Sequence, residues 1–133
     1  MTRLILALIV LAFATCASAS KEGILPLSNF RLESDGIDGS GKVVVEGKGD
    51  KDGHVVSLKV TAFGKDYLVP KDKLGRLGGL MANGVRISYE AGYAELGGRT
   101  VYVQLQMGWT SSTRQKGVIT VTENGKIEIE MGN

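Results

Sequence analysis

The stretch VITVTENGKIEIEM, residues 118–131, decides the fold class because its apolar residues can form a β-hairpin in only one register. A two-residue turn at Asn-Gly would place Val121 opposite Glu128 and so mix charge into the apolar face. A three-residue loop at 123–125 instead pairs apolar with apolar residues: Val121 with Ile127, and Ile119 with Ile129. The pattern therefore predicts a type I turn followed by a bulge in which Gly125 is left-handed.

A second hairpin is predicted upstream, where residues 54–63 alternate strictly between apolar and polar side chains. A period of two with one apolar face is typical of a half-buried strand, whose buried side chains would be Val56, Leu58, Val60 and Ala62. Gly64 and Lys65 suit a type II′ turn. That turn would place Ala62 opposite Tyr67 and Val60 opposite Val69.

Other runs rich in Val, Ile and Thr alternate with Gly, Asp and Asn clusters at roughly ten-residue spacing, which is typical of a sandwich or barrel. Further strands are expected at residues 30–33, 42–46, 85–93 and 101–107. Leu74 and Leu77, between Pro70 and Gly78, predict one or two turns of helix. Because most connections are short, we expect an all-β antiparallel sandwich of about seven or eight strands with one short helix. A partly open β-barrel is the alternative.

The first 19 residues, MTRLILALIVLAFATCASA, differ from the rest of the chain. One Arg, an apolar run at 4–14 and the small residues at 17–19 form the pattern of a secretory signal peptide. The apolar run is too short to cross a membrane, because a spanning helix needs about 20 residues. We therefore expect cleavage after Ala19, a single domain at 20–133, no transmembrane span in the mature chain, and a secreted or periplasmic location. Lipid anchoring through Cys16 is the minor alternative.

Composition excludes several functional classes. One Cys and one His supply neither an intramolecular disulfide nor a zinc site of the usual kind. With 16 Lys and Arg against 14 Asp and Glu, the chain lacks the charge excess of a nucleic-acid-binding protein. No cofactor is indicated, and we expect none.

The segment AGYAELGGR, residues 91–99, carries the first group of candidate functional residues. Glu90 and Glu95 are two carboxylates that could divide general-acid and general-base work, as in glycoside hydrolysis. A carboxylate paired with Arg99 as a structural clamp is the alternative reading. Glu90, Tyr93, Glu95 and Arg99 are also candidates for contact with a ligand or partner.

Aromatic residues offer a second candidate site, a stacking platform for sugar rings. Alternation places Tyr67, Tyr89 and Tyr93 on apolar faces, so these three are expected in the core. Tyr102 shares the polar face with Gln104 and Gln106, and Trp109 begins the following loop. This exposed set is the better candidate for a binding patch.

Two aspartate pairs and the histidine complete the candidates. Asp50 and Asp52, and likewise Asp35 and Asp38, lie in glycine-rich turns and are weak calcium candidates, since the full EF-hand spacing is absent. Asp and Gly are also what hairpin turns prefer. Any Ser/His/Asp triad would need His54, and no Gly-x-Ser-x-Gly sequence accompanies it.

The sequence thus leaves three functional hypotheses. The one we favour is a small exported, non-enzymatic binding or accessory module with an unknown protein or glycan partner. A carbohydrate-binding module using Tyr102 and Trp109 is the first alternative, and a small hydrolase using Glu90 and Glu95 is the second. The scarcity of His argues against catalysis, because acid/base chemistry uses His most often.

Overall fold

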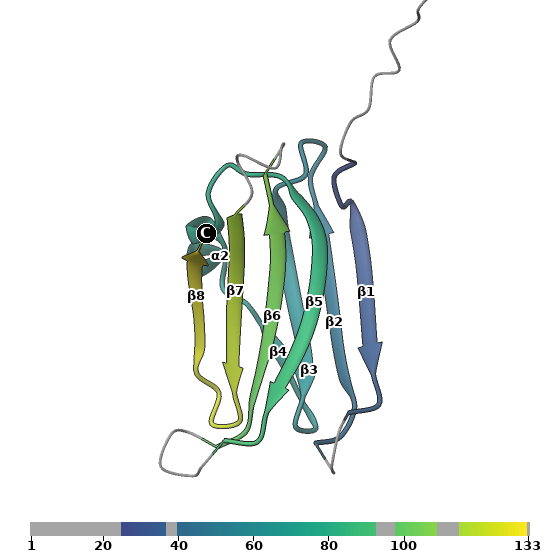
Figure 1. Ribbon diagram of the computed structural model, residues 1–133, viewed down its shortest axis with the longest axis vertical. Coiled ribbons are helices and arrows are strands. Elements are labelled where there is room, and N and C mark those ends of the chain that lie inside the picture. Colours follow the sequence, from purple (N-terminus) through teal and green to yellow (C-terminus); the bar gives the residue numbers. More distant parts are fainter. Residues whose placement is uncertain (1–24, 37–39, 93–97, 109–114, 133) are drawn as a thin grey trace, which may run out of the picture.

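Two four-stranded antiparallel sheets pack face to face (Figure 1). The computed structural model describes residues 25–36, 40–92, 98–108 and 115–132. The first sheet contains, in order, β1 (Asn29–Ser34), β2 (Val43–Gly49), β3 (Val55–Ala62) and β4 (Lys65–Leu68). The second contains β5 (Ala82–Glu90), β6 (Thr100–Met107), β7 (Gln115–Thr122) and β8 (Ile127–Gly132). The predicted all-β sandwich with one short helix is confirmed, and the strands form two separate sheets rather than a barrel.

The core lies between the sheets and is built by the alternation seen in the sequence. In β6, for example, every second residue is buried while the residues between are half-buried on the other face. Fully buried side chains come from both sheets and include Val45, Leu58, Val60, Val101, Val103, Leu105, Ile119 and Val121. Of the tyrosines expected in the core, Tyr67 is buried and Tyr89 packs against the core while partly exposed. Tyr93 lies outside the described residues.

The hairpin between β7 and β8 has the predicted register. Val121 is opposite Ile127 and Ile119 is opposite Ile129. The Gly125 N–H donates to the Thr122 carbonyl at 2.9 Å, and Gly125 has φ of 92°. The three-residue loop with a left-handed glycine is therefore confirmed.

The hairpin between β3 and β4 differs from the prediction by two residues in register. Ala62 is opposite Lys65 and Val60 is opposite Tyr67, so the turn residues are Phe63 and Gly64. Both have positive φ, 55° and 71°, which is the pattern of a type I′ turn rather than the predicted type II′. A shift of two residues keeps every side chain on its face, so hydrophobic alternation alone did not distinguish the two registers.

The exposure of Val56 is the second difference between the prediction and the structure. It was expected in the core with Leu58, but its exposure is 47%. The register of β2 against β3 shifts here, with Lys48 opposite Ser57 and Gly49 opposite Val55. Val56 is thus the extra residue of a β-bulge, which locally breaks the alternation and turns Val55 toward the core instead.

The helical segment lies where predicted and closes one side of the core. α2 (Lys71–Leu74) follows Pro70 and continues into the 3₁₀ helix η2 (Gly75–Leu77), which ends at Gly78 with φ of 68°. Leu74 and Leu77 are buried, and the segment lies beside β8 in Figure 1. None of the described helices has the length and apolar character needed to cross a membrane.

Candidate functional site

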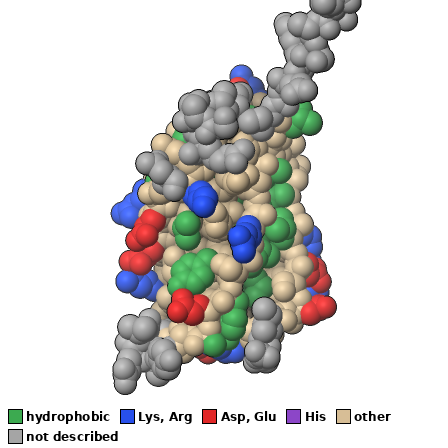
Figure 2. All heavy atoms as spheres, viewed as in Figure 1, with side chains coloured by type: hydrophobic (Ala, Val, Ile, Leu, Met, Phe, Trp, Pro, Cys, Tyr) green, Lys and Arg blue, Asp and Glu red, His purple; other side chains and the backbone are tan. Residues whose placement is uncertain are grey.

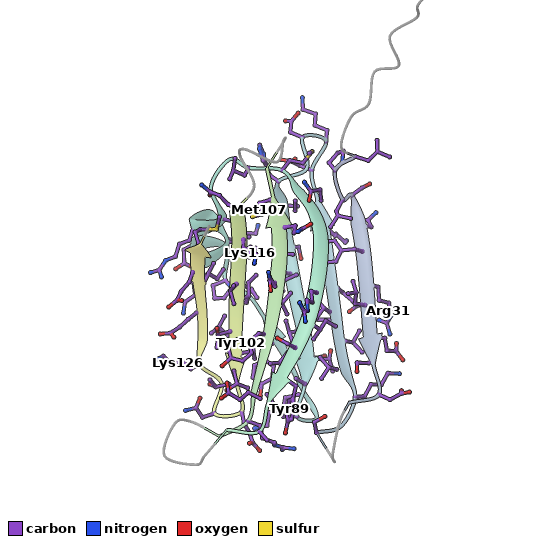
Figure 3. All side chains as sticks on the ribbon, in the orientation of Figure 1. Arg31, Tyr89, Tyr102, Met107, Lys116 and Lys126 are labelled. Atoms are coloured by element: carbon purple, nitrogen blue, oxygen red, sulfur yellow. The ribbon has the colours of Figure 1, made fainter. Side chains whose placement is uncertain are left out.

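The outward side of β6 and its two neighbours is the surface that the sequence singled out. Tyr102, Gln104 and Gln106 alternate with the buried residues of β6 and are each half-buried on the solvent side. Arg86 of β5 lies directly opposite Gln104, and Lys116 of β7 lies directly opposite Gln106. Opposite residues share a face, so these five side chains form one surface, which we call the β6 face. Figure 3 labels Tyr102 and Lys116 along it.

Tyr102 is fixed in place by a carboxylate. Its hydroxyl donates to Glu90 Oε2 at 2.6 Å, across from β6 to the end of β5. This hydrogen bond raises the pKa of Tyr102 above its ordinary value, because a deprotonated phenol would lose the bond and lie beside a negative charge. Tyr102 therefore stays a neutral hydrogen-bond donor, with its hydroxyl held at Glu90.

A shallow hollow of about 330 Å³ opens on the β6 face. Its lining is formed by Gly84, Val85, Arg86, Gln104, Gln106 and Lys116. A Cβ at Gly84 would approach the Gln106 Oε1 to 3.2 Å, so glycine leaves room here for the glutamine side chain. The hollow therefore combines two amides with two cations.

The charges of this hollow are not neutralised within the described part of the chain. Arg86 and Lys116 form no hydrogen bond or ion pair with any described residue. The solvent side of the first sheet is different, because Arg31 bonds Glu46 at 2.7 Å and Lys59 bonds the same carboxylate at 2.8 Å. Both cations of the hollow on the β6 face are thus available to a ligand.

Arg99 has a structural role of the kind considered as an alternative from the sequence. Its guanidinium donates to both carboxylate oxygens of Glu123, at 2.7 Å and 3.1 Å, and its backbone N–H donates to the same group. The Arg99 guanidinium also lies 5.2 Å from the centre of the Phe63 ring in the first sheet's β3–β4 turn. Arg99 therefore clamps the two sheets at one end of the sandwich.

Three of the candidate residues, Tyr93, Glu95 and Trp109, lie outside the described residues. The hydrolase hypothesis required Glu90 and Glu95 to converge, so the structure does not test it. Of the first candidate group, Glu90 belongs to the β6 face through Tyr102, while Arg99 belongs to the clamp.

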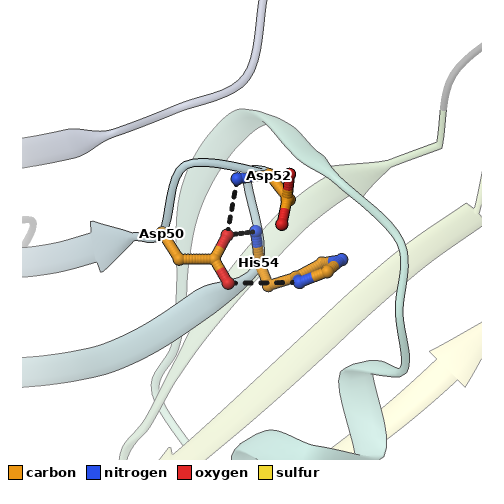
Figure 4. A group of neighbouring side chains, drawn as sticks. All are labelled: Asp50, Asp52 and His54. Carbon is orange, nitrogen blue, oxygen red and sulfur yellow. Dashed lines mark hydrogen bonds and ion pairs between the residues drawn. The ribbon is translucent and has the colours of Figure 1, made fainter.

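His54, Asp50 and Asp52 form a compact group in the β2–β3 turn (Figure 4). One Asp50 oxygen accepts the backbone N–H groups of Asp52 and His54, and the other lies 3.2 Å from His54 Nδ1. The His54 backbone donor, above all, holds the pKa of the Asp50 carboxyl below its ordinary value. His54 Nε2 lies 3.1 Å from the Gly79 carbonyl.

The contacts of His54 link the β2–β3 turn to another part of the chain. Each ring nitrogen of His54 lies within hydrogen-bond distance of an acceptor, Nδ1 of the Asp50 carboxylate and Nε2 of the Gly79 carbonyl, and a neutral imidazole donates to one of the two. The imidazole therefore lies between this turn and the loop after η2. The three side chains offer ligand atoms within 4.8 Å of one another and are, among the described residues, the group that could hold a cation. Asp50 and His54 are already bonded within the turn, whereas Asp52 takes part through its backbone N–H. Asp38 of the second aspartate pair lies outside the described residues.

Sequence reasoning placed Tyr102, Gln104 and Gln106 on one exposed face but missed Arg86 and Lys116. Neither cation stands out in the chain, and each joins the face only through strand register. The partner of Arg99 was missed for the same reason, since Glu123 is 24 residues away.

Comparison with known proteins identifies no relative: no protein-family model matches the chain, and the searches of curated proteins and of solved structures found no match. The fold and the site therefore define the protein by class alone. It is an antiparallel β-sandwich in which one sheet has a polar outward face with two cations at its hollow.

Proposed function

We propose that this protein is an exported, non-enzymatic binding module that contacts its ligand through the β6 face. The observation that carries the proposal is the alignment of Tyr102, Gln104 and Gln106 on one strand between two cations that have no partner in the described chain. Rigid sheet faces suit binding, because their side chains are held in place before the ligand arrives.

The described chemistry supports binding rather than catalysis. The partners of His54 among the described residues are Asp50 and the Gly79 carbonyl, and no described hydroxyl or thiol lies in hydrogen-bond contact with the imidazole as a nucleophile would. Glu90 accepts the Tyr102 hydroxyl, which fits a positioning role. A hydrolytic activity lost in Glu90→Gln, with circular dichroism unchanged, would overturn this part of the proposal.

The β6 face can be tested on an array of neutral and acidic oligosaccharides, probed with the whole mature chain. We expect at least one bound saccharide, and we expect the double variant Tyr102→Ala/Gln104→Ala to lose it. Ser57→Ala/Leu68→Ala is the matched control, because these residues are on the first sheet and Leu68 is 67% exposed. Saccharide binding that survives in the β6-face variant but not in the control would place the site on the other sheet.

Export is the second component of the proposal, and it rests on the signal-peptide pattern of residues 1–19. We expect intact-mass spectrometry of the protein recovered from the producing cell's medium or periplasm to give a chain beginning at Ser20. A chain that keeps residues 1–19, or one that begins with a lipid-bearing Cys16, would contradict cleavage after Ala19.

A further inference from the structure

The amides and cations that line the hollow on the β6 face indicate which class of ligand it binds. This inference rests on the proposed function. Gln104 and Gln106 occupy the middle strand, with Arg86 on one side and Lys116 on the other. Adjacent strands are about 4.8 Å apart, so the two cations start from backbones separated by roughly 10 Å across the sheet. Arg86 and Lys116 are both exposed, and their long side chains can turn toward one bound group.

Charge is the first argument for the ligand. Figure 2 shows basic side chains in the middle of this face and acidic side chains mostly toward its sides. The two cations of the hollow have no described partner, whereas Arg31 and Lys59 of the first sheet are both paired with Glu46. A negatively charged group is therefore the complement of these two cations.

Hydrogen-bonding capacity is the second argument. Arg86 and Lys116 offer only donors, with the planar guanidinium matched to a carboxylate or sulfate. Gln104 and Gln106 offer both donors and acceptors, which is what sugar hydroxyls require. Tyr102 precedes Gln104 on the same face, outside the lining of the hollow, with its hydroxyl bonded to Glu90. Its ring can support the apolar face of a pyranose that extends beyond the hollow.

We propose that the hollow binds an acidic saccharide, with its carboxylate or sulfate between Arg86 and Lys116 and its hydroxyls on Gln104 and Gln106. Two cations are too few for a nucleic-acid surface, where affinity depends on many phosphate contacts. An anionic membrane would be expected to take up apolar side chains as well. The exposed large hydrophobic residues of the described chain, Leu25, Val56 and Leu68, all lie away from this face.

The test uses calorimetric titration of the mature chain with oligogalacturonate, with the same oligomer as its methyl ester, and with a sulfated galactan oligomer. We expect an acidic oligomer to bind, and the ester to bind about tenfold more weakly than its acid, since a charge-assisted bond is worth about that factor. Binding of the acidic form should also weaken with added salt, while that of the ester should not.

Arg86→Gln/Lys116→Gln should reduce binding of the acidic oligomer at least as much as esterification does. Lys48→Gln/Arg76→Gln is the matched control, because it removes the same charge from exposed residues elsewhere and should leave binding unchanged. Circular dichroism and the melting temperature check that both variants remain folded.

Equal binding of acid and ester, or unchanged binding in Arg86→Gln/Lys116→Gln, would overturn the inference. If the ester binds equally and Tyr102→Ala abolishes binding, the β6 face remains a saccharide site and only its acidic specificity fails. Absence of binding to every acidic oligomer, or tighter binding to duplex DNA or phosphatidylglycerol vesicles through the same two cations, would also overturn it.

Discussion

Arg99 holds Glu123 through both side-chain oxygens and through its own backbone N–H, joining the start of β6 to the end of β7. The Glu123 backbone N–H in turn donates to the Arg99 carbonyl at 2.8 Å. Because the Arg99 guanidinium also stacks on Phe63, the same side chain connects the second sheet to the first. This end of the sandwich is thus held by charge as well as by apolar packing.

Acid sensitivity of this clamp is the first prediction. Hydrogen bonds from Arg99 lower the pKa of the Glu123 carboxyl from its ordinary 4.5 to about 2. A lowered folded-state pKa stabilises the fold above the unfolded pKa, and that contribution is lost as pH falls from about 4.5 toward about 2. The melting temperature of Glu123→Gln should therefore lie below that of the wild type at neutral pH, with the difference shrinking through this window.

Glu130→Gln is the control for the clamp, because Glu130 is an exposed glutamate of β8 without an ion pair among the described residues. Its melting temperature should follow the wild-type value at every pH. A Glu123→Gln difference that stays constant from pH 7 to pH 2 would show that the lost charge is not the cause.

Tyr67 carries the second prediction. Its side chain is 9% exposed, and its hydroxyl is buried without a hydrogen-bond partner in the described structure. A buried, unsatisfied hydroxyl is destabilising, so Tyr67→Phe should raise the free energy of unfolding by about 1 kcal/mol. The ring and its edge contact with Phe63 would be kept.

Urea denaturation measures this change, with Tyr102→Phe as the comparison. That substitution removes a hydroxyl that is bonded to Glu90, so it should give no such gain. A loss of stability in Tyr67→Phe would mean that the hydroxyl has a stabilising partner, such as a buried water.

Gly117 explains how η2 fits against the second sheet, and it gives the third prediction. A Cβ at this position would lie 2.6 Å from Leu77 Cδ2 and 3.4 Å from the sulfur atoms of Met107 and Met131. Gly117→Ala should therefore lower the free energy of unfolding by about 1–3 kcal/mol through overpacking. Gly132→Ala in the neighbouring strand meets open space and should change stability much less.

A double variant identifies the contact at Gly117. In Gly117→Ala/Leu77→Ala the new methyl group has room, so the combined cost should be smaller than the sum of the two single costs. Strictly additive costs, measured by urea denaturation, would argue against contact with Leu77.

The faces of the strands could be predicted from the sequence, because a period of two places each side chain on one side of a sheet. Register was predictable only where a wrong choice buries charge. In the last hairpin the alternative placed Glu128 opposite Val121, whereas in the β3–β4 hairpin both Tyr67 and Val69 are acceptable opposite Val60. The bulge at Val56 followed from the pairing of β3 with β2, which local alternation does not contain.

The candidate site also contains residues that the sequence could predict and residues that it could not. Tyr102, Gln104 and Gln106 could be grouped because they lie on one strand. Arg86 and Lys116 join them only through the order and register of three strands, and Glu123 reaches Arg99 only because β6 and β7 are neighbours. Local alternation therefore predicts which residues of one strand share a face. The charged residues that neighbouring strands add to that face are identified only from the tertiary structure.

The last prediction contrasts two glycines that both face open space. Gly125 has φ of 92° in the β7–β8 loop, whereas Gly75 has φ of −58° at the junction of α2 and η2. Gly125→Ala should cost about 1–2 kcal/mol, because an L side chain is strained in the left-handed region. Gly75→Ala should raise the free energy of unfolding by up to about 1 kcal/mol, because the φ at this position suits alanine and the substitution reduces the conformational freedom of the unfolded chain. Opposite shifts of the urea midpoint would attribute both effects to backbone conformation, since neither methyl group meets another residue, while shifts of the same sign would refute that explanation.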